Sequence, residues 1–446
     1  MKRAIDCGHM LKVDIHLKNS PLQGSTQTYV QSFATGETID GVVSVFSQGD
    51  LAFENLHISF IGEQSTSIPS ATPSKATHQF LHLIQPLEDS ILPSPKIFRS
   101  RTRYEIPFSF HVTDYLPATA CPHTSHPLVK AAHLHPPPSL GDATIAGFGG
   151  RLRDDLAPTA CKIVYTIIVK LERPSITTGL QETIMEKRLK VRIKPHVGDI
   201  PLPDLDLGKL AEEYALFQRG DTQKGKLAVT LEPPDCFWHP LGDTVSLISK
   251  AVKLVLVYEP PSSTATTSAA RDSVTLPELK SLRAQITATT LYTTRFDGPR
   301  PPQKQRDFFG RPINFRDAEV PLELPSLPQL RWTRMDTQTT PTMGSNPELG
   351  PQPVPGSTST STPGAGAGIS YIATLLVPVT LTKDLSFVPT FHSCLISRIY
   401  SLNFQLEVKG ASRGFRLKAP MKIAAERDPG ALPSYNASLG VIETAD

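Results

Sequence analysis

The side chains best suited to binding a metal lie close together in one stretch of the sequence. One thiol and four imidazoles are available there, from Cys121, His123, His126, His133 and His135. Thiolates and imidazoles are ligands that Zn²⁺ prefers in proteins. Their spacing matches no zinc-binding signature, however, and the surrounding prolines are typical of a loop. We therefore predict that these side chains pack or face solvent, and that the protein binds neither a metal nor another cofactor.

Basic residues occupy every second position of another stretch, namely Arg188, Lys190, Arg192 and Lys194. On a β-strand, this spacing places all four side chains on one face. Such a face could bind a phosphorylated or acidic cargo peptide, or the anionic surface of a membrane. A strand whose basic side chains are simply solvated explains the same pattern. The sequence leaves both interpretations open.

Motifs of common enzymes do not occur in the sequence. There is no Gly-x-Ser-x-Gly, no HExxH, no paired-carboxylate motif and no kinase signature. Residues 364–368 are rich in glycine, but no Gly-Lys-Ser/Thr follows them, which indicates a linker and not a phosphate-binding loop. We expect a protein without catalytic activity.

The composition indicates a β-rich protein with more than one domain. A length of 446 residues suits two domains of about 150 to 220 residues each. The 42 prolines are nearly twice the usual share of about 5%, which favours strands joined by long irregular segments. A net charge of +3 argues against nucleic acid as a partner. The five cysteines form no CxxC pair and no apolar signal segment is seen, so we expect free thiols in the cytosol.

Alternation of apolar and polar residues is the main signal of the first 195 residues. It is clearest from Tyr104 to Val112, where apolar side chains take one parity and polar ones the other. Pro107 in this stretch indicates an edge strand or a bulge, because proline cannot donate a ladder hydrogen bond. Similar stretches give seven strands, the number in an immunoglobulin-like sandwich. We predict them at 11–17, 38–47, 56–62, 78–85, 104–112, 161–171 and 184–194.

Residues 196–225 break this alternation and form the predicted connector between two domains. Within it, Leu207, Leu210, Tyr214 and Phe217 have helical spacing, which predicts a short helix. A second series of about seven strands follows within residues 226–425. We predict these strands at 226–231, 244–249, 252–258, 282–290, 371–381, 395–408 and 415–423.

Segments rich in Ser, Thr, Pro and Gly are too polar to be buried and too flexible to order at low cost. We predict disordered loops at 262–268 and 335–368, and a flexible tail at 426–446. The predicted fold class is therefore all-β, with two tandem immunoglobulin-like seven-strand β-sandwiches at 1–195 and 226–425, joined by long disordered loops.

Several short stretches, taken in order, carry a likeness to a known family. They are TGETIDG at 35–41, the strand at 56–62, IPFSF at 106–110, the loop from CPH at 121–123 through AHL at 132–134 to PPSLG at 137–141, and SCLISRIY at 393–400. With these residues the chain resembles the arrestin-like proteins, most closely the fungal α-arrestin group. The resemblance covers nearly the whole chain, and it implies that both sandwiches are arrestin domains.

The resemblance implies a non-catalytic trafficking adaptor, which links cytosolic tails of membrane transporters or receptors to the ubiquitin and endocytic machinery. Leu432, Pro433 and Tyr435 support this function, since they match the Leu/Pro-Pro-x-Tyr motif that WW domains of HECT-type ubiquitin ligases bind. Pro433 favours the polyproline II conformation that such domains recognise. We expect a cytosolic monomer that associates peripherally with the plasma membrane or endosomes.

Other functions remain open. A retromer-like coat or sorting subunit would use the same fold and act without a ligase. A β-sandwich enzyme or carbohydrate binder is less favoured, because neither a secretory signal nor a catalytic constellation is seen. The family often carries several WW-binding motifs, whereas this chain has one of the Leu variant, so ligase binding that is weak or dependent on avidity is also open.

Overall fold

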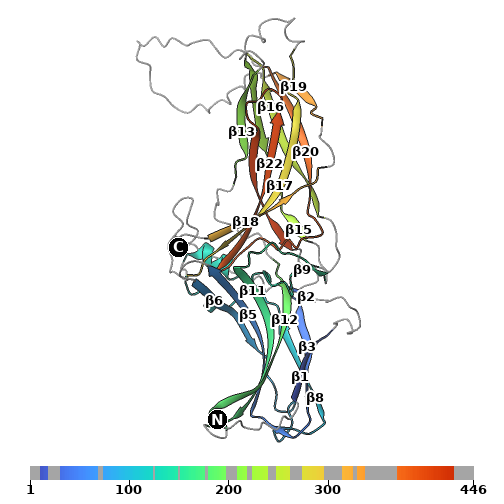
Figure 1. Cartoon of the computed structure of the whole chain (residues 1–446), viewed down its shortest axis with the longest axis vertical. Helices are drawn as coiled ribbons and strands as arrows, with labels where there is room; N and C mark the ends of the chain where they lie inside the picture. The colour runs from blue at the N-terminus through green and yellow to red at the C-terminus, as the bar shows by residue number, and fades with distance from the viewer. Residues whose placement is uncertain are drawn as a thin grey trace, which may run out of the picture.

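The structure is a computed structural model of the chain. It describes residues 11–18, 31–68, 74–123, 126–148, 151–175, 179–196, 208–217, 223–239, 248–261, 274–295, 314–324, 329–336 and 369–425. Nearly all regular structure in these ranges is β-strand, which confirms the predicted all-β class. The strands form two sandwiches that stack along the long axis of the molecule in Figure 1.

The first sandwich consists of a three-stranded sheet, β1-β3-β8, and a five-stranded sheet, β2-β12-β11-β5-β6. Neighbouring strands are antiparallel, except that β2 runs parallel to β12. In β11, buried residues alternate with partly exposed ones because successive side chains point to opposite faces. The bounds are β1 Leu11–Leu17, β2 Ser32–Ala34, β3 Thr38–Ser47, β5 Asn55–Ile68, β6 Ser74–Ile84, β8 Arg103–His111, β11 Cys161–Pro174 and β12 Gln181–Lys194.

All seven strands predicted for this half are confirmed, but the count of seven is too low. The additional strands have only two or three residues, too few to show an alternation. Pro107 lies in β8, which pairs only with β3 and is an edge strand, as predicted. Besides β2, the additional strands are β4 Leu51–Ala52, β7 Ile97–Phe98, β9 Gly147–Phe148 and β10 Arg151–Leu152.

The predicted loop after β8 contains two short helical segments. A 3-10 turn covers Ala118–Ala120, and the helix α1 covers Pro127–His133. Proline suits the first position of a helix because the N–H it lacks would have no helical partner there. Val129, Ala132 and His133 are buried, so α1 packs one face against the protein.

The second sandwich has two five-stranded sheets. One has the order β13-β14-β16-β20-β19, and the other β18-β17-β22-β21 with β23 beside β22. The strands predicted at 226–231, 252–258, 282–290, 371–381, 395–408 and 415–423 are confirmed. The bounds are β13 Ala211–Phe217, β14 Gln223–Leu231, β15 Phe237–His239, β16 Ser249–Glu259, β17 Leu279–Tyr292, β18 Asn314–Pro321, β19 Trp332–Asp336, β20 Ile369–Thr380, β21 Phe391–His392, β22 Ile396–Val408, β23 Phe415–Met421 and β24 Ile423–Ala425.

The short helix predicted between the sandwiches is wrong. Tyr214 and Phe217 lie in β13, an edge strand paired with β14, Leu210 directly precedes that strand, and Leu207 is outside the described residues. The prediction relied on apolar residues marking the buried positions. In this strand one buried position holds a carboxylate, so the remaining apolar residues have a helical spacing. Glu212 is buried and accepts hydrogen bonds from the Arg416 backbone N–H (2.6 Å) and the Tyr214 hydroxyl (3.1 Å), and it also pairs with Lys209. These partners make burial of the charge tolerable. Pairing with a neighbouring strand thus outweighed local periodicity.

Several predictions lie wholly or mostly outside the described residues. The strand predicted at 244–249 is described only from Ile248, and Ser249 already belongs to β16. The loop at 262–268 and the tail at 426–446 are outside the described ranges. Of the insertion predicted at 335–368, the first two residues end β19 and the rest lies outside.

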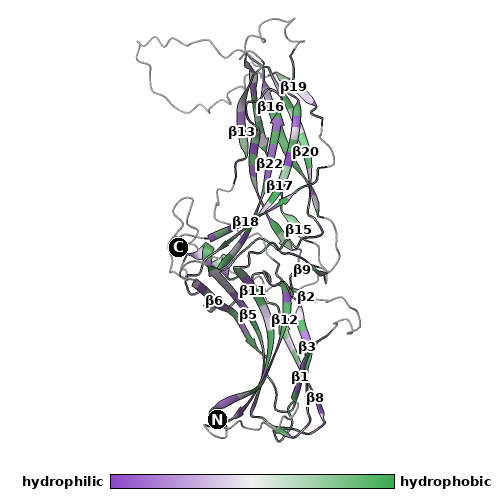
Figure 2. Cartoon of the chain, in the orientation of Figure 1, coloured by the Kyte–Doolittle hydropathy of each residue, from purple (hydrophilic) through white to green (hydrophobic). Residues whose placement is uncertain are grey.

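Each sandwich has its own apolar core, visible in Figure 2 as hydrophobic positions that recur along the strands. β22 differs between its two halves. All residues from Ile396 to Leu402 are buried, whereas buried positions alternate from Asn403 to Val408. The first half is covered on both faces because it lies where the sandwiches meet. Among the described residues, no helix has the length and apolar character needed to cross a membrane.

Candidate functional site

The two sandwiches are joined by a turn of the second that is packed into the first. We call residues 388–396, around β21 and the start of β22, the junction turn. Its apolar side chains, including Phe391 and Leu395, belong to the core of the first sandwich. The Gln64 Oε1 atom accepts hydrogen bonds from the Ser393 hydroxyl (2.7 Å) and the Leu395 backbone N–H (3.3 Å). The junction turn is therefore fixed by both packing and hydrogen bonds.

Beside the junction turn, two cysteines and two histidines come together. Ligand atoms of Cys121, His123, His133 and Cys394 all lie within 4.8 Å of one another. The Cys121 Sγ atom is 3.4 Å from His133 Nδ1 and 3.7 Å from both ring nitrogens of His123. We call these four residues the Cys-His cluster. Cys121, His133 and Cys394 are buried, and His123 is partly exposed.

Sequence reasoning found three members of the Cys-His cluster and missed the fourth. His126 and His135, which were grouped with them, are not part of it: His126 precedes α1, and the His135 ring packs 4.6 Å from that of Tyr115. Cys394 lies on the junction turn, with its Sγ atom 3.7 Å from the carbonyl of Ala120, 274 positions away in sequence. No local pattern could have paired residues so distant.

The two thiols of the Cys-His cluster influence each other. The hydrogen bond from Cys394 is the largest cause that lowers the pKa of Cys121, and contacts with His123 and His133 act in the same direction. The same contact, followed by burial, raises the pKa of Cys394. Burial lowers the pKa of His133, which favours its neutral imidazole. One thiolate beside a neutral imidazole is a set of groups able to bind a soft or borderline cation.

On another side of the junction, Arg398 of β22 is completely buried. Its Nη1 and Nη2 atoms donate to the backbone carbonyls of Asp155 and Leu156, each at 3.1 Å. The guanidinium also lies over the ring of Tyr400, 5.8 Å from its centre. A buried charge is tolerated only with such partners, so Arg398 ties the second sandwich to a loop of the first.

That loop depends on Gly141, at the end of the Pro-Pro-Ser-Leu-Gly stretch. Its φ is +70°, and a Cβ atom there would lie 2.1 Å from the carbonyl oxygen of Cys161. Only glycine fits both the conformation and the close approach. The Gly141 N–H donates to the carboxylate of Asp155 (2.7 Å), which places the Asp155 carbonyl for Arg398.

Asp142, the next residue, is a buried carboxylate held by two lysines. Its Oδ2 atom lies 2.7 Å from Lys190 Nζ and 3.0 Å from Lys162 Nζ, and Thr144 donates to its other oxygen. Burial alone would raise the pKa of Asp142, but the hydrogen bonds from Lys190, Thr144 and Lys162 outweigh it and lower the pKa. Asp142 is thus ionised, and the positive charges of Lys190 and Lys162 balance its negative charge.

The four predicted basic residues lie on β12 as expected, but they do not form a uniform solvated face. Arg188 is exposed and pairs with Glu186, whereas Lys190 is held by Asp142. Arg192 is only 2% exposed, and its Nε atom donates to the Ile145 carbonyl at 2.5 Å. Arg192 therefore belongs to the interior and is not available to a partner in this structure. Lys194 is partly buried beside a recess.

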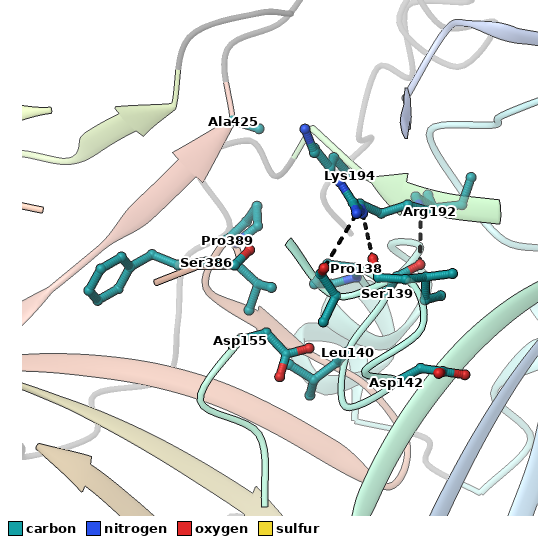
Figure 3. A pocket seen from close by; sticks show the side chains of 15 residues that line it. Pro138, Ser139, Leu140, Asp142, Asp155, Arg192, Lys194, Ser386, Pro389 and Ala425 are labelled. Atoms are coloured by element: carbon teal, nitrogen blue, oxygen red, sulfur yellow. Dashed lines mark hydrogen bonds between the residues drawn. The ribbon is translucent and has the colours of Figure 1, made fainter. Parts of the chain in front are cut away.

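This recess lies between the sandwiches and is shown in Figure 3. Ser386 and Pro389 of the second sandwich face Ser139, Leu140 and Asp155 of the first across it. Its volume is about 30 Å³, which suits about two water molecules and not an organic ligand. The recess is a small gap where the two sandwiches meet, and its size does not indicate a substrate site.

The residues predicted to bind a WW domain, Leu432, Pro433 and Tyr435, lie outside the described residues. The structure therefore neither places them nor relates them to the junction. No protein-family model matches this chain, and no curated protein matches it either.

Proposed function

We propose that the chain is a non-catalytic adaptor of the arrestin-like type. Its two sandwiches would hold the cytosolic tail of a membrane transporter or receptor, and the motif near position 433 would recruit a WW-domain HECT-type ubiquitin ligase. The observation that carries this proposal is the end-to-end packing of two all-β sandwiches through the junction turn. A scaffold of two joined domains suits the binding of two partners at once.

The positions of the basic residues on β12 limit which of them can bind cargo. Arg188 is exposed on β12 and can meet an acidic or phosphorylated peptide, or an anionic membrane surface. Arg192 is interior and Lys190 is committed to Asp142, so neither is expected to contribute. Peripheral recruitment to the plasma membrane or endosomes would then depend on the cargo more than on this strand.

The ligase side is tested by binding of the full-length chain to the WW domains of a HECT-type ligase. Replacing Pro433 and Tyr435 together by alanine is expected to abolish pull-down, because both side chains dock in the aromatic groove. Ser434→Ala is the matched control, since it changes the variable position of the motif and is expected to bind like the parent. Thermal unfolding of all three proteins shows whether the fold is intact.

Undiminished binding of the double variant would discard the ligase mechanism. Co-purification at fixed stoichiometry with coat subunits, unaffected by the same double substitution, would favour a retromer-like sorting subunit in its place.

A further inference from the structure

The Cys-His cluster has the composition of a structural zinc site. Two thiols and two imidazoles are one of the common ligand sets of tetrahedral Zn²⁺ in proteins. Binding of the ion would release the proton of the Cys394 thiol to solvent. Two thiolates would then balance the charge of the dication, so the occupied site would be neutral, as a buried position requires. Among first-row cations, a tetrahedral set of two sulfur and two nitrogen ligands favours zinc.

The distances within the Cys-His cluster are close to those of a tetrahedral site. Zn–S bonds of about 2.3 Å and Zn–N bonds of about 2.0 Å place neighbouring ligand atoms roughly 3.3 to 3.8 Å apart. The observed separations of Cys121 Sγ from His133 Nδ1 (3.4 Å) and from the His123 ring nitrogens (3.7 Å) fall in this range. No two ligand atoms in the set are more than 4.8 Å apart, which is about 1 Å beyond the widest spacing of a bound tetrahedral site.

The backbone holds these ligands in place without help from a metal. His133 is the last residue of α1, and Cys121 directly follows the 3-10 turn at Ala118–Ala120. Cys394 is flanked by Ser393 and Leu395, both of which are bonded to Gln64. A site whose ligands are already positioned binds its ion with little ordering cost.

We propose that Cys121, His123, His133 and Cys394 bind one Zn²⁺ ion, which fastens the junction turn of the second sandwich to the first. This inference replaces the prediction from sequence that the histidine-rich loop binds no metal. It does not depend on the adaptor function. Because the first three ligands are separated from Cys394 by most of the chain, the ion acts as a cross-link between the sandwiches. It stabilises the folded state, since the unfolded chain does not keep the ligands together.

The test measures bound metal in the full-length chain, purified without chelators after expression in zinc-supplemented medium. Elemental analysis is expected to find one zinc per chain in the parent and almost none in His123→Ala. His123 is only partly buried, so this variant is expected to fold, which circular dichroism checks. Cys394→Ser provides a second variant from the other side of the junction.

Cys236→Ser is the matched control. Cys236 is a cysteine of intermediate exposure that lies outside the Cys-His cluster, so its variant should retain the full zinc content. Cobalt substitution adds a spectroscopic readout, because tetrahedral thiolate ligation gives a charge-transfer band that should disappear in Cys394→Ser. A chelator is expected to lower the melting temperature of the parent and of Cys236→Ser by several degrees, and to leave that of His123→Ala unchanged.

A parent protein that contains no zinc, and whose melting temperature does not rise when zinc chloride is added, overturns the proposal. So does equal zinc content in the parent and in His123→Ala, or iron in place of zinc. A disulfide between Cys121 and Cys394 overturns it as well, if mass spectrometry without reductant finds it in protein whose free thiols were alkylated at lysis.

Discussion

The junction between the sandwiches is built differently on two sides. On the first, the polar side, the charges of Arg398 and Asp142 are matched by carbonyls and lysines of the chain itself. On the second, the Cys-His cluster gathers soft ligands around a point that a cation can occupy. The polar side should therefore stabilise the junction whether or not zinc is present, whereas the contribution of the Cys-His cluster should follow the availability of zinc.

The largest effect is expected from Arg398→Met. The variant leaves the buried carbonyls of Asp155 and Leu156 without their donor, which should cost about 3 kcal/mol of unfolding free energy. Denaturant unfolding measures this loss, and the exposed Arg413→Met serves as the control. If the polar side is independent of the metal, the loss is the same with zinc and with a chelator. A loss that disappears in the chelator would break the distinction between the two sides.

A smaller loss of unfolding free energy is expected from Gly141→Ala. The added Cβ meets the Cys161 carbonyl and the positive φ is strained, so the loop must shift, at a cost of about 2 kcal/mol. Gly208→Ala is the control, because its Cβ would have its nearest neighbour at 3.4 Å. Melting temperatures of both variants check this prediction. An unchanged Gly141→Ala protein would show that the loop does not hold the Asp155 carbonyl in place.

The smallest effect is expected from Asp142→Asn, which keeps an oxygen for Thr144 but loses the attraction of Lys190 and Lys162. Both lysines are partly exposed, so solvent screening limits the loss to about 1 kcal/mol at pH 7. The lysines lower the pKa of Asp142, so its contribution is complete above the ordinary carboxyl pKa of about 4 and is lost as the pH falls below it. Unfolding measured from pH 7 to pH 3 should show a constant difference between the two proteins down to about pH 4 and a narrowing difference below it.

Alternation along single strands was enough to predict most of the β-structure. From Cys161 to Leu171 the buried and partly exposed residues alternate as the sequence indicates. The prediction was wrong for β13, where Glu212 takes a buried position and the apolar residues retain a helical spacing. It also missed β18, which is exposed on both faces over most of its length and so has no alternation. The alternation of apolar and polar residues predicts a strand only where the apolar residues are the buried ones. The prediction fails where a polar residue is buried or where both faces are exposed.

The basic residues of β12 show that the sequence pattern is also limited in predicting a binding site. The sequence places Arg188, Lys190 and Arg192 on one face, and they lie on one strand as predicted. Their different environments depend on Asp142 and on the Ile145 carbonyl, which come from a loop more than 40 residues earlier. No local pattern indicates that this loop covers one end of the strand, so their roles could not be separated from sequence.

By itself, the sequence determined most of the strands and the chemical character of the histidine-rich loop, because both depend on residues that are neighbours in the chain. The match of residues 432–435 to a WW-binding motif stays a prediction. Only the tertiary structure decided which residues meet at the junction. Cys394 joins Cys121, and Arg398 reaches the loop at Asp155, through folding that brings together segments more than 240 residues apart. Such contacts follow from the packing of the two sandwiches, whose free energy is distributed over the apolar residues that they bury together.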